Sequence, residues 1–457
     1  MTVAAAISEL QSLLGERLNV SKSDRDIHGR SEVYYQPMPP DAVAYPETTQ
    51  EVSEIVKICA RHDCPVIPWG TGTSLEGHAL ALKGGVTVDF QRMNKVLEVN
   101  AEDMDCRVQP GITRIALNED LRATGLFFPV DPGANASIGG MASTRASGTT
   151  TVMYGTMADN VMGLEVVLAD GRIIRTGSRA RKTSAGYDLT HLFVGSEGTL
   201  GLITELTLKL RGQPEAISAG ICAFNSIEDA VQCVMSTIQM GIPMARIEFV
   251  DAATTMAFNA YSGRDMPEKP HLLVEFNGSD ASVKEQSERF GEIVKDHDGS
   301  DFEWATRPED RNALWKLRHD GYYAILASRK GCTAMSTDIC VPISRLAEAV
   351  TETQDDIADS PLPGPILGHV GDGNFHAILM MDPDNPEELK EAKRLADRMV
   401  DRALDMGGTV TGEHGVGMGK MKYMTREHGD AWSVMSDIKR SFDPQNILNP
   451  GKMVQIN

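Results

Sequence analysis

The chain has 457 residues, of which 41% are hydrophobic and 24% charged, so it can bury a large core and we expect two or more domains. Its 64 acidic residues outnumber the 44 basic ones, and the formal net charge is −20. Because no run of lysine and arginine offsets that charge, binding of nucleic acid or anionic lipid is disfavoured. Small anionic substrates stay open, since a few well-placed cations act at short range.

Seven cysteines are scattered along the chain, and no two of them form a C-x-x-C pair. This pattern disfavours a zinc knuckle or a thioredoxin-like site and favours a reducing compartment. Residues 1–20 predict an amphipathic helix that lacks the marks of a secretion signal or an organelle presequence. No stretch approaches the ~20 apolar residues of a membrane span. We therefore expect a soluble cytoplasmic protein without a transmembrane segment, and leave peripheral attachment to a membrane open.

Short apolar runs alternate with segments of helical periodicity in the first half of the chain. Helices are predicted at residues 49–61 and 112–124. Strands are predicted at residues 65–68, 86–90, 105–108, 163–168 and 173–176. The last two strands flank the turn Asp170-Gly171 and are expected to form a hairpin.

The pattern changes around Gln213-Pro214, where a second α/β unit is predicted to begin. Its helices are predicted near residues 226–240, 280–297, 308–329, 343–358 and 385–406. Its strands are predicted near residues 218–223, 245–250, 271–276, 334–341 and 375–381. We therefore expect an α+β fold with a first domain over residues 1–213, a second over 214–415, and a helical C-terminal segment over 416–457 that returns to the first domain.

Common nucleotide-binding and hydrolytic motifs are missing from the sequence. Neither G-x-G-x-x-G nor G-x-S-x-G nor H-E-x-x-H occurs, so a Rossmann site, an α/β-hydrolase and a zinc protease have no support. Residues 415–420 superficially suggest a phosphate loop. They lack its first glycine, and Met421 stands where Ser or Thr should hold magnesium.

Three glycine-rich stretches occur in the first domain. Residues 68–74 (Pro-Trp-Gly-Thr-Gly-Thr-Ser) combine closely spaced backbone N–H groups with hydroxyls, which suits a pyrophosphate, with a tight surface turn as the alternative. Residues 130–161 place small residues at many positions, which suggests a backbone pressed against a flat ligand. Residues 195–204 (Gly-Ser-Glu-Gly-Thr-Leu-Gly-Leu-Ile-Thr) form the third stretch.

In this order and spacing, the three stretches resemble the FAD-binding domain of the vanillyl-alcohol oxidase and p-cresol methylhydroxylase flavoprotein family, over residues 40–212. The resemblance implies a two-domain flavoprotein with an α/β substrate, or cap, domain. It also implies that residues 68–74 hold the pyrophosphate and that the isoalloxazine ring lies between the two domains. Some relatives tether the flavin through a histidine in the first loop. That loop has none here, so we expect non-covalent FAD, with His78 the only nearby tether candidate.

The positions that the resemblance assigns to FAD are small or hydroxylated residues for the most part. They are Pro68, Trp69, Gly70, Thr71, Gly72, Thr73, Ser74, Pro132, Gly133, Ile138, Gly139, Gly140, Ser143, Gly148, Tyr154, Gly155, Val161, Glu197, Gly198, Gly201, Ile203 and Asn449.

A cluster of polar residues in the last quarter of the chain indicates a catalytic site. His369 and His376 flank a Gly-rich turn, so both imidazoles can face one ion. Glu413 would complete a three-ligand site with an open position, as a catalytic divalent metal requires. The adjacent His414 could then act as a base in the same pocket. The alternative is a set of partly buried histidines that are satisfied by nearby turns.

These stretches resemble the C-terminal half of the D-2-hydroxyacid dehydrogenase branch of the same flavoprotein family, so the resemblance covers nearly the whole chain. It implies that the metal ligands are His369, His376 and Glu413, with Zn²⁺ or Mn²⁺ as the ion. It also implies that His414 is the active-site base and that Arg318 binds the substrate carboxylate. The closing Asn449-Pro450-Gly451-Lys452 matches as well.

Two departures from the 2-hydroxyglutarate enzymes of that branch bear on the substrate. Those enzymes have a lysine where this chain has Ser336 and an asparagine where it has Ile378. Without these two groups, a second carboxylate of the substrate would have no partner, and burying an unpaired carboxylate is costly. We therefore expect a monocarboxylate, with D-lactate as the leading substrate. Glycolate oxidation as the D subunit of a complex, D-2-hydroxyglutarate oxidation, and an inactive flavin-binding subunit are the alternatives.

The resemblance also implies a mechanism. Arg318 would hold the substrate carboxylate, the metal would bind the 2-hydroxyl, and His414 would take the hydroxyl proton while the Cα hydride passes to flavin N5. An electron acceptor must then reoxidise the flavin, and a cytochrome, a quinone or an electron-transfer protein each fits. Whether the chain forms a homo-oligomer stays open.

Overall fold

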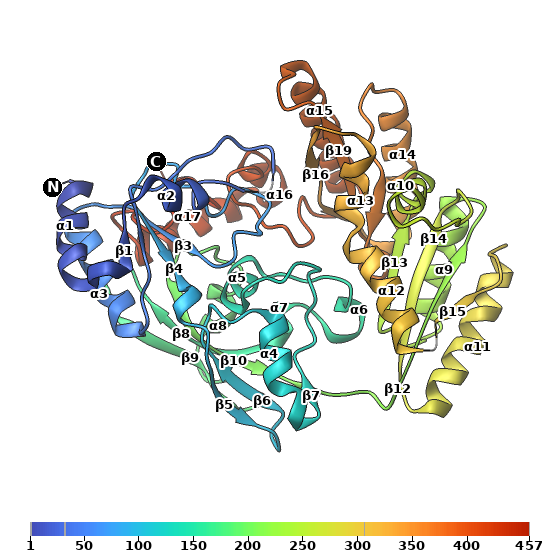
Figure 1. The fold of residues 1–457 in the computed structure, drawn as a ribbon, viewed down its shortest axis with the longest axis horizontal. Coiled ribbons are helices and arrows are strands. Elements are labelled where there is room, and N and C mark those ends of the chain that lie inside the picture. The colour runs from blue at the N-terminus through green and yellow to red at the C-terminus, as the bar shows by residue number, and fades with distance from the viewer. Residues whose placement is uncertain (1, 32, 306, 457) are drawn as a thin grey trace. The chain divides into compact units, whose positions relative to one another are not determined.

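The structure is a computed structural model that describes residues 2–31, 33–305 and 307–456. It contains two compact units, each built from several chain segments (Figure 1). Unit 1 consists of Met1–Ser147, Gly155–Gln213 and Glu413–Asn457, and unit 2 consists of Gly148–Tyr154 and Pro214–Gly412.

The division between the units lies after Gln213, where the composition of the sequence changes. The other boundaries between the two units differ from the predicted domain boundaries. The chain leaves unit 2 after Gly412 rather than after residue 415, and Gly148–Tyr154 belongs to unit 2. The side chain of Val152 in this short segment packs directly against the backbone of Gly371, where a Cβ would lie 2.9 Å from the Val152 methyl.

The first part of unit 1 is a four-stranded sheet in the order β1-β2-β4-β3. Its strands are β1 (Leu18–Asn19), β2 (Ala42–Ala44), β3 (Val66–Trp69) and β4 (Val86–Asp89). Its helices are α1 (Val3–Leu14), α2 (Lys22–Ile27) and α3 (Thr49–Arg61). Helix α1 lies beside α3 (Figure 1), and both place apolar side chains in a core that they share with β2, β3 and β4.

The second part of unit 1 is a five-stranded antiparallel sheet in the order β5-β6-β10-β8-β9. Its strands are β5 (Val96–Asn100), β6 (Asp105–Val108), β8 (Val161–Val167), β9 (Ile173–Gly177) and β10 (Leu202–Lys209), and β7 (Leu126–Phe127) pairs separately with β11 (Arg211–Gly212). The remaining helices of unit 1 are α4 (Arg114–Leu121), α5 (Ile138–Thr144), α7 (Met157–Asn160), α8 (Leu189–Phe193), α16 (Met424–His428) and α17 (Asp430–Phe442).

Unit 2 is built on a mainly antiparallel sheet in the order β15-β12-β14-β13-β18-β19-β16, with β17 paired to β19. Its strands are β12 (Ala216–Ala223), β13 (Arg246–Val250), β14 (His271–Gly278), β15 (Glu303–Ala305), β16 (Thr333–Ser336), β17 (Ile339–Cys340), β18 (Ile366–Gly368) and β19 (Asn374–Met381). Its helices are α6 (Thr151–Tyr154), α9 (Ile227–Gln239), α10 (Ala252–Ser262), α11 (Asp280–Asp296), α12 (Pro308–His319), α13 (Gly321–Ser328), α14 (Leu346–Ala358) and α15 (Pro386–Asp405).

Short 3-10 segments complete both units. They are η1 (Gly15–Arg17), η2 (Phe90–Arg92), η3 (Arg122–Thr124), η4 (Ile343–Arg345), η5 (Val370–Asp372) and η6 (Met421–Tyr423).

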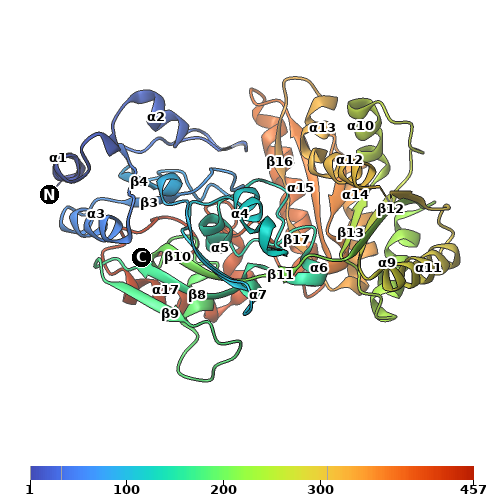
Figure 2. The ribbon, with the colours of Figure 1, turned by 60° about the horizontal axis from the view of Figure 1, so that its bottom comes forward.

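Helices α10, α12 and α13 cover one face of the unit 2 sheet (Figure 2). Side chains alternate between the two faces along each strand. Val250, Leu367 and Ile378 belong to the core beneath those three helices. Residues two positions away on the same strands, such as Glu248 and His376, therefore project toward the same helices.

Three predicted elements differ from those observed. The helix expected over residues 1–20 ends at Leu14, because Gly15 takes a positive φ of 56° and stops the helical path. The helix expected over 308–329 is interrupted at Asp320, the residue between α12 and α13. The strand expected over 334–341 is split into β16 and β17 at Thr337-Asp338, whose side chains bond to Ala377 and Asn374 of β19.

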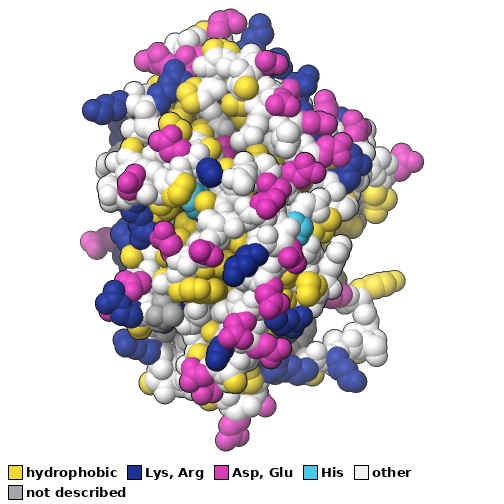
Figure 3. Space-filling model, turned by 90° about the vertical axis from the view of Figure 1, so that its right-hand side faces the viewer, with side chains coloured by type: hydrophobic (Ala, Val, Ile, Leu, Met, Phe, Trp, Pro, Cys, Tyr) yellow, Lys and Arg dark blue, Asp and Glu magenta, His cyan; other side chains and the backbone are white. Residues whose placement is uncertain are grey.

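Charge is mixed rather than segregated on the face shown in Figure 3, where acidic and basic side chains of the described residues are interspersed. None of the helices in the described part of the chain is both long enough and apolar enough to cross a membrane.

Candidate active site

The two histidines predicted as metal ligands lie side by side in unit 2. His369 follows the end of β18, and His376 lies in β19 opposite Leu367 of that strand. Their ring centroids are 5.5 Å apart with an interplanar angle of 81°. One ring nitrogen of His369 and one of His376 lie within 4.8 Å of each other, a spacing that two ligands of a single ion can have.

Hydrogen bonds fix how both imidazoles present their nitrogens. Nδ1 of His376 lies 2.9 Å from the carbonyl oxygen of Thr337, which only accepts, so this nitrogen carries the proton. Nδ1 of His369 lies 2.7 Å from Oε1 of Glu248 and donates in the same way. In a neutral imidazole with Nδ1 protonated, Nε2 has the lone pair that binds a metal. The donor set therefore fits a divalent metal.

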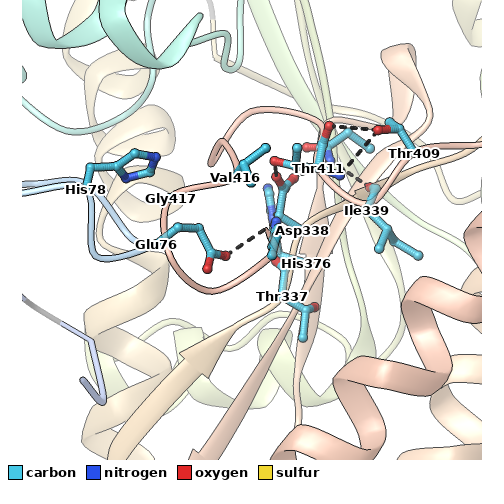
Figure 4. A network of polar contacts seen from close by, with 12 residues as sticks. Glu76, His78, Thr337, Asp338, Ile339, His376, Thr409, Thr411, Val416 and Gly417 are labelled. Atoms are coloured by element: carbon cyan, nitrogen blue, oxygen red, sulfur yellow. Dashed lines mark hydrogen bonds and ion pairs between the residues drawn. The ribbon is translucent and has the colours of Figure 1, made fainter. Parts of the chain in front are cut away.

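The segment that leads to Glu413 is anchored within unit 2 up to Gly412. Thr411 Oγ1 donates to Asp338 Oδ2 at 2.6 Å (Figure 4), and Asn374 Nδ2 donates to Asp338 Oδ1 at 2.8 Å. A Cβ on Gly412 would lie 2.3 Å from Asn374 Nδ2, so only glycine allows this approach. Glu413 is the next residue along the chain.

From Glu413 onward the chain belongs to unit 1, where other contacts hold it. Ser147 Oγ donates to Glu413 Oε2 at 2.9 Å. The backbone N–H groups of Val416 and Gly417 donate to the Glu197 carboxylate at 2.7 and 2.9 Å. His414, the predicted base, lies between these two anchored points in the sequence.

Glu197 is buried and takes a left-handed φ of 53°. His78 Nε2 lies 3.2 Å from its Oε1, and Figure 4 shows His78 together with Val416 and Gly417. Burial by itself would raise the pKa of Glu197. The charge and hydrogen bond of His78 and the two backbone amides instead hold the pKa below its usual value. We assigned Glu197 to FAD from the sequence, whereas the contacts of its carboxylate here are with residues 416–417 and His78.

The three glycine-rich stretches meet in unit 1. A Cβ on Gly70 would lie 2.0 Å from Ser137 Oγ. The first stretch therefore lies against the start of α5, which belongs to the second stretch. A Cβ on Gly198 would lie 2.3 Å from Pro68 Cγ, which joins the third stretch to the first. Asn449 Nδ2 donates to the carbonyl oxygens of both Glu197 and His78.

Several of the residues assigned to FAD have another role in the described structure. Ile138, Val161 and Ile203 lie in the hydrophobic core of unit 1. Gly139 is glycine because a Cβ would lie 2.4 Å from Pro110 Cβ. Gly148 and Tyr154 fall in unit 2, so the second stretch is divided between the two units.

Arg318 lies in the last turn of α12 and is 8% exposed. Its guanidinium Nη2 is 2.6 Å from Oε2 of Glu248, the carboxylate whose other oxygen bonds to His369. Within the described part of the chain, the buried Nε of Arg318 has no hydrogen-bond partner. A buried donor without a partner costs free energy, which a bound carboxylate would offset.

The two positions used to infer substrate size are neighbours in the sheet. Ser336 of β16 lies directly opposite Ile378 of β19. Residues opposite each other in an antiparallel pair point to the same face. Because His376 and Ile378 also share a face of β19, the Ser336–Ile378 pair lies on the histidine side of the sheet.

Sequence reasoning missed Glu248, Thr337 and Ser147, each of which bonds to one of the predicted metal ligands. A signal for Glu248 was present, because it is a lone carboxylate in the otherwise apolar run Ile247 to Val250. Such a residue in a central strand needs a buried partner. The contact of Thr337 is made by its backbone, so its side chain gave no signal.

Comparison with known proteins agrees with these features. Residues 213–453 match the family described as "FAD linked oxidases, C-terminal domain", and residues 40–177 match that described as "FAD binding domain". A protein of Danio rerio named a probable mitochondrial D-lactate dehydrogenase is 48% identical, covering 99% of this chain and 92% of its own. A mitochondrial D-lactate dehydrogenase [cytochrome] of Arabidopsis thaliana is 45% identical, covering 98% and 80%.

The fold is shared with solved flavoproteins. A crystal structure of p-cresol methylhydroxylase with substrate bound superimposes with a TM-score of 0.83 over 98% of this chain and 96% of that one, at 19% identity. The fold is thus that of a two-domain flavoprotein of the vanillyl-alcohol oxidase type, as the sequence predicted. The chain belongs to the FAD-linked oxidase family, and it contains an FAD-binding domain.

Proposed function

We propose that the chain is an FAD-dependent dehydrogenase that oxidises D-lactate to pyruvate. The observation that carries the proposal is that one buried carboxylate of unit 2, Glu248, contacts both His369 and Arg318, and that the ring of His376 lies beside that of His369. Such a group can receive a metal-bound hydroxy acid on one side and its carboxylate on the other. The names of the relatives from Danio rerio and Arabidopsis thaliana support the same substrate.

When bound, FAD would supply a hydride acceptor and a divalent metal would supply Lewis acidity at the 2-hydroxyl group. Residues 68–74, the positions of the second and third glycine-rich stretches named in the sequence analysis, and Asn449 would hold FAD, and His369, His376 and Glu413 would hold Zn²⁺ or Mn²⁺. The metal assignment is supported by the Nδ1 hydrogen bonds, which leave Nε2 of both histidines as ligand atoms.

The protein's own groups bind the substrate and move one proton. Arg318 binds the carboxylate as a two-pronged donor, and its position is fixed by Glu248. His414, as a neutral imidazole, takes the hydroxyl proton, so that the hydride can leave Cα as the carbonyl forms. One hydride and one proton leave the substrate, which accounts for the two electrons lost in going from lactate to pyruvate.

Ser336 and Ile378 define the side of the site that meets the substrate's third carbon. Neither residue carries a positive charge that could form an ion pair with a second carboxylate, and Ile378 offers an apolar surface to a methyl group. We therefore favour D-lactate over D-2-hydroxyglutarate.

The physiological electron acceptor is proposed as a cytochrome, as the printed name of the Arabidopsis relative suggests for that protein. A quinone or an electron-transfer protein would serve the same step. The cytoplasmic location stays a prediction, and both relatives described above carry mitochondrial names. A homo-oligomeric state also stays a prediction.

The test is anaerobic reduction of the bound flavin followed by steady-state kinetics with a dye acceptor. D-Lactate should bleach the flavin absorbance, and its kcat/KM should exceed those of glycolate, L-lactate and D-2-hydroxyglutarate. A higher kcat/KM for glycolate or D-2-hydroxyglutarate would reject the substrate assignment. Absence of bleaching with every hydroxy acid would reject the enzyme and leave a flavin-binding subunit. The metal is tested by dialysis against a chelator, which should abolish turnover, followed by recovery with Zn²⁺ or Mn²⁺.

A further inference from the structure

Glu248 contacts two functional groups that sequence analysis assigned to different tasks. It lies in β13, the strand between β14 and β18 near the middle of the unit 2 sheet. Its side chain is 1% exposed. Phe249 lies opposite Gly368 in the antiparallel β13–β18 pair, so Glu248 lies across from His369.

The two carboxylate oxygens of Glu248 have different partners. Oε1 accepts from Nδ1 of His369 at 2.7 Å, and Oε2 lies 2.6 Å from Nη2 of Arg318. A carboxylate with this burial is costly unless it is paired, and here Oε1 is hydrogen-bonded to His369 and Oε2 forms an ion pair with Arg318. Both partners thereby lose freedom: the imidazole is held in one tautomer and ring orientation, and the guanidinium in one rotamer.

We infer that Glu248 is a positioning residue that couples the metal ligand His369 to the carboxylate-binding Arg318. The inference rests on the proposed function for the roles of those two residues. A carboxylate behind a metal-bound histidine orients the ring and raises its basicity, and removing such a partner commonly lowers metal affinity tenfold to a hundredfold. The same carboxylate holds the guanidinium, so one substitution should weaken both metal binding and substrate binding.

Glu248→Gln tests the coupling of His369 to Arg318. It keeps the shape of the side chain and replaces one of the two acceptor oxygens by an NH₂ group. A glutamine has one oxygen and one amide NH₂ at the two positions that Oε1 and Oε2 occupy, so in the same rotamer its NH₂ faces either His369 or Arg318, both of which are donors. We expect the metal dissociation constant, measured by competition with a chromophoric chelator, to rise about tenfold or more. We also expect KM for D-lactate to rise while the flavin content stays unchanged.

The matched control is Glu275→Gln. Glu275 is a buried carboxylate of the neighbouring strand β14 and has its own arginine, with Arg246 Nε 3.8 Å from its Oε1. Glu275 lies opposite Arg246 in the β13–β14 pair, and Arg246 is two residues before Glu248 in β13. Glu275→Gln should therefore lower stability comparably and leave metal affinity near that of the unmodified enzyme.

Glu248→Asp covers the case in which Glu248→Gln does not fold. It keeps the charge but retracts the carboxylate, so both contacts should lengthen and metal affinity should again fall. Metal affinity in Glu248→Gln or Glu248→Asp equal to that of the unmodified enzyme would overturn the inference, as would an equal loss in Glu275→Gln. Metal binding is measured without substrate, so it tests Glu248 separately from the reaction. If Glu248→Gln loses metal affinity while the unmodified enzyme is inactive on D-lactate, the proposed substrate is rejected and the role of Glu248 is kept.

Discussion

The two units of the molecule use different parts of the polypeptide to build their candidate sites. In unit 1 the residues assigned to FAD are mostly glycines and hydroxyl residues, whose close approach brings backbones together, as at Gly70 and Ser137. In unit 2 the candidate site consists of charged and imidazole side chains on one face of a sheet, around Glu248. A large cofactor can thus be met by backbone amides, whereas a small substrate needs a few oriented side chains.

The difference predicts opposite responses to substitution. A change at a close backbone contact in unit 1 should loosen the cofactor and be rescued by adding more of it. A change in the side-chain cluster of unit 2 should stop chemistry while the cofactor stays bound. The predictions below test this contrast, from the largest expected effect to the smallest.

His369→Ala should lower kcat with D-lactate at least a thousandfold, because a metal ligand contributes several kcal/mol to the transition state and 1.4 kcal/mol is about tenfold in rate. The flavin should stay bound, since His369 belongs to unit 2 and the glycine-rich stretches meet in unit 1. Dye reduction and the ratio of flavin to protein absorbance measure the two properties. Loss of flavin together with activity would break the contrast between the units.

Ser336→Lys should shift the preference toward D-2-hydroxyglutarate. The new ammonium group would extend from the Ser336–Ile378 pair and could meet a second carboxylate, so the kcat/KM ratio of D-2-hydroxyglutarate to D-lactate should rise about tenfold or more. Ser336→Met, of similar length and without charge, should leave the ratio unchanged. An equal change in both variants would mean that the side chain acts by size alone.

Gly70→Ala should weaken FAD binding about fivefold. The new Cβ would lie 2.0 Å from Ser137 Oγ, whose bond to the N–H of Gly140 caps α5, and displacing such a cap costs about 1 kcal/mol. Activity should return when FAD is added in excess, which is the reverse of the His369→Ala result. Gly212→Ala serves as the control, because a Cβ there has no atom within 4 Å and φ is not positive.

Lys452 should make stability depend on pH. Its buried amine donates to Leu80 O and Asn449 Oδ1, and burial lowers its pKa from 10.5 to about 7. Between these values the unfolded chain binds a proton that the folded chain does not, so the free energy of unfolding should rise with pH, by at most about 1.4 kcal/mol per pH unit. Lys452→Met should flatten this dependence. An identical slope of the thermal midpoint against pH in both proteins, from pH 7 to 9, would contradict the prediction.

The sequence predicted the fold class, the α3 helix over Thr49–Arg61 and the β8–β9 hairpin, because these depend on local periodicity and on the turn Asp170-Gly171. It did not predict the short strands β15 and β18, which have few residues and each pair with a strand far away in the sequence, β12 and β13 respectively. The split of β16 from β17 has the same origin, since Thr337 and Asp338 bond to β19 and to Thr411.

The candidate metal ligands could be proposed from residue types, but the groups that hydrogen-bond to them could not. Ser147 bonds to Glu413 across 266 positions of the chain, and Glu248 bonds to His369 across 121. No local pattern encodes such distances. The backbone carbonyl of Thr337 is invisible for another reason, since every residue has one and only the fold selects which will face His376.

The chain passes between the two units after residues 147, 154, 213 and 412. All of unit 2 has therefore been synthesised once residue 412 is added, whereas unit 1 still lacks residues 413–457. That segment contributes the bridge from Leu448 to Val66 and the Lys439 amine that donates to the Thr199 carbonyl. Domains tend to fold during synthesis in the order in which they are completed. Unit 1, which contains the first residues of this sequence, is thus completed after unit 2, and its glycine-rich stretches gain their contacts with residues 413–457 only after unit 2 has been made.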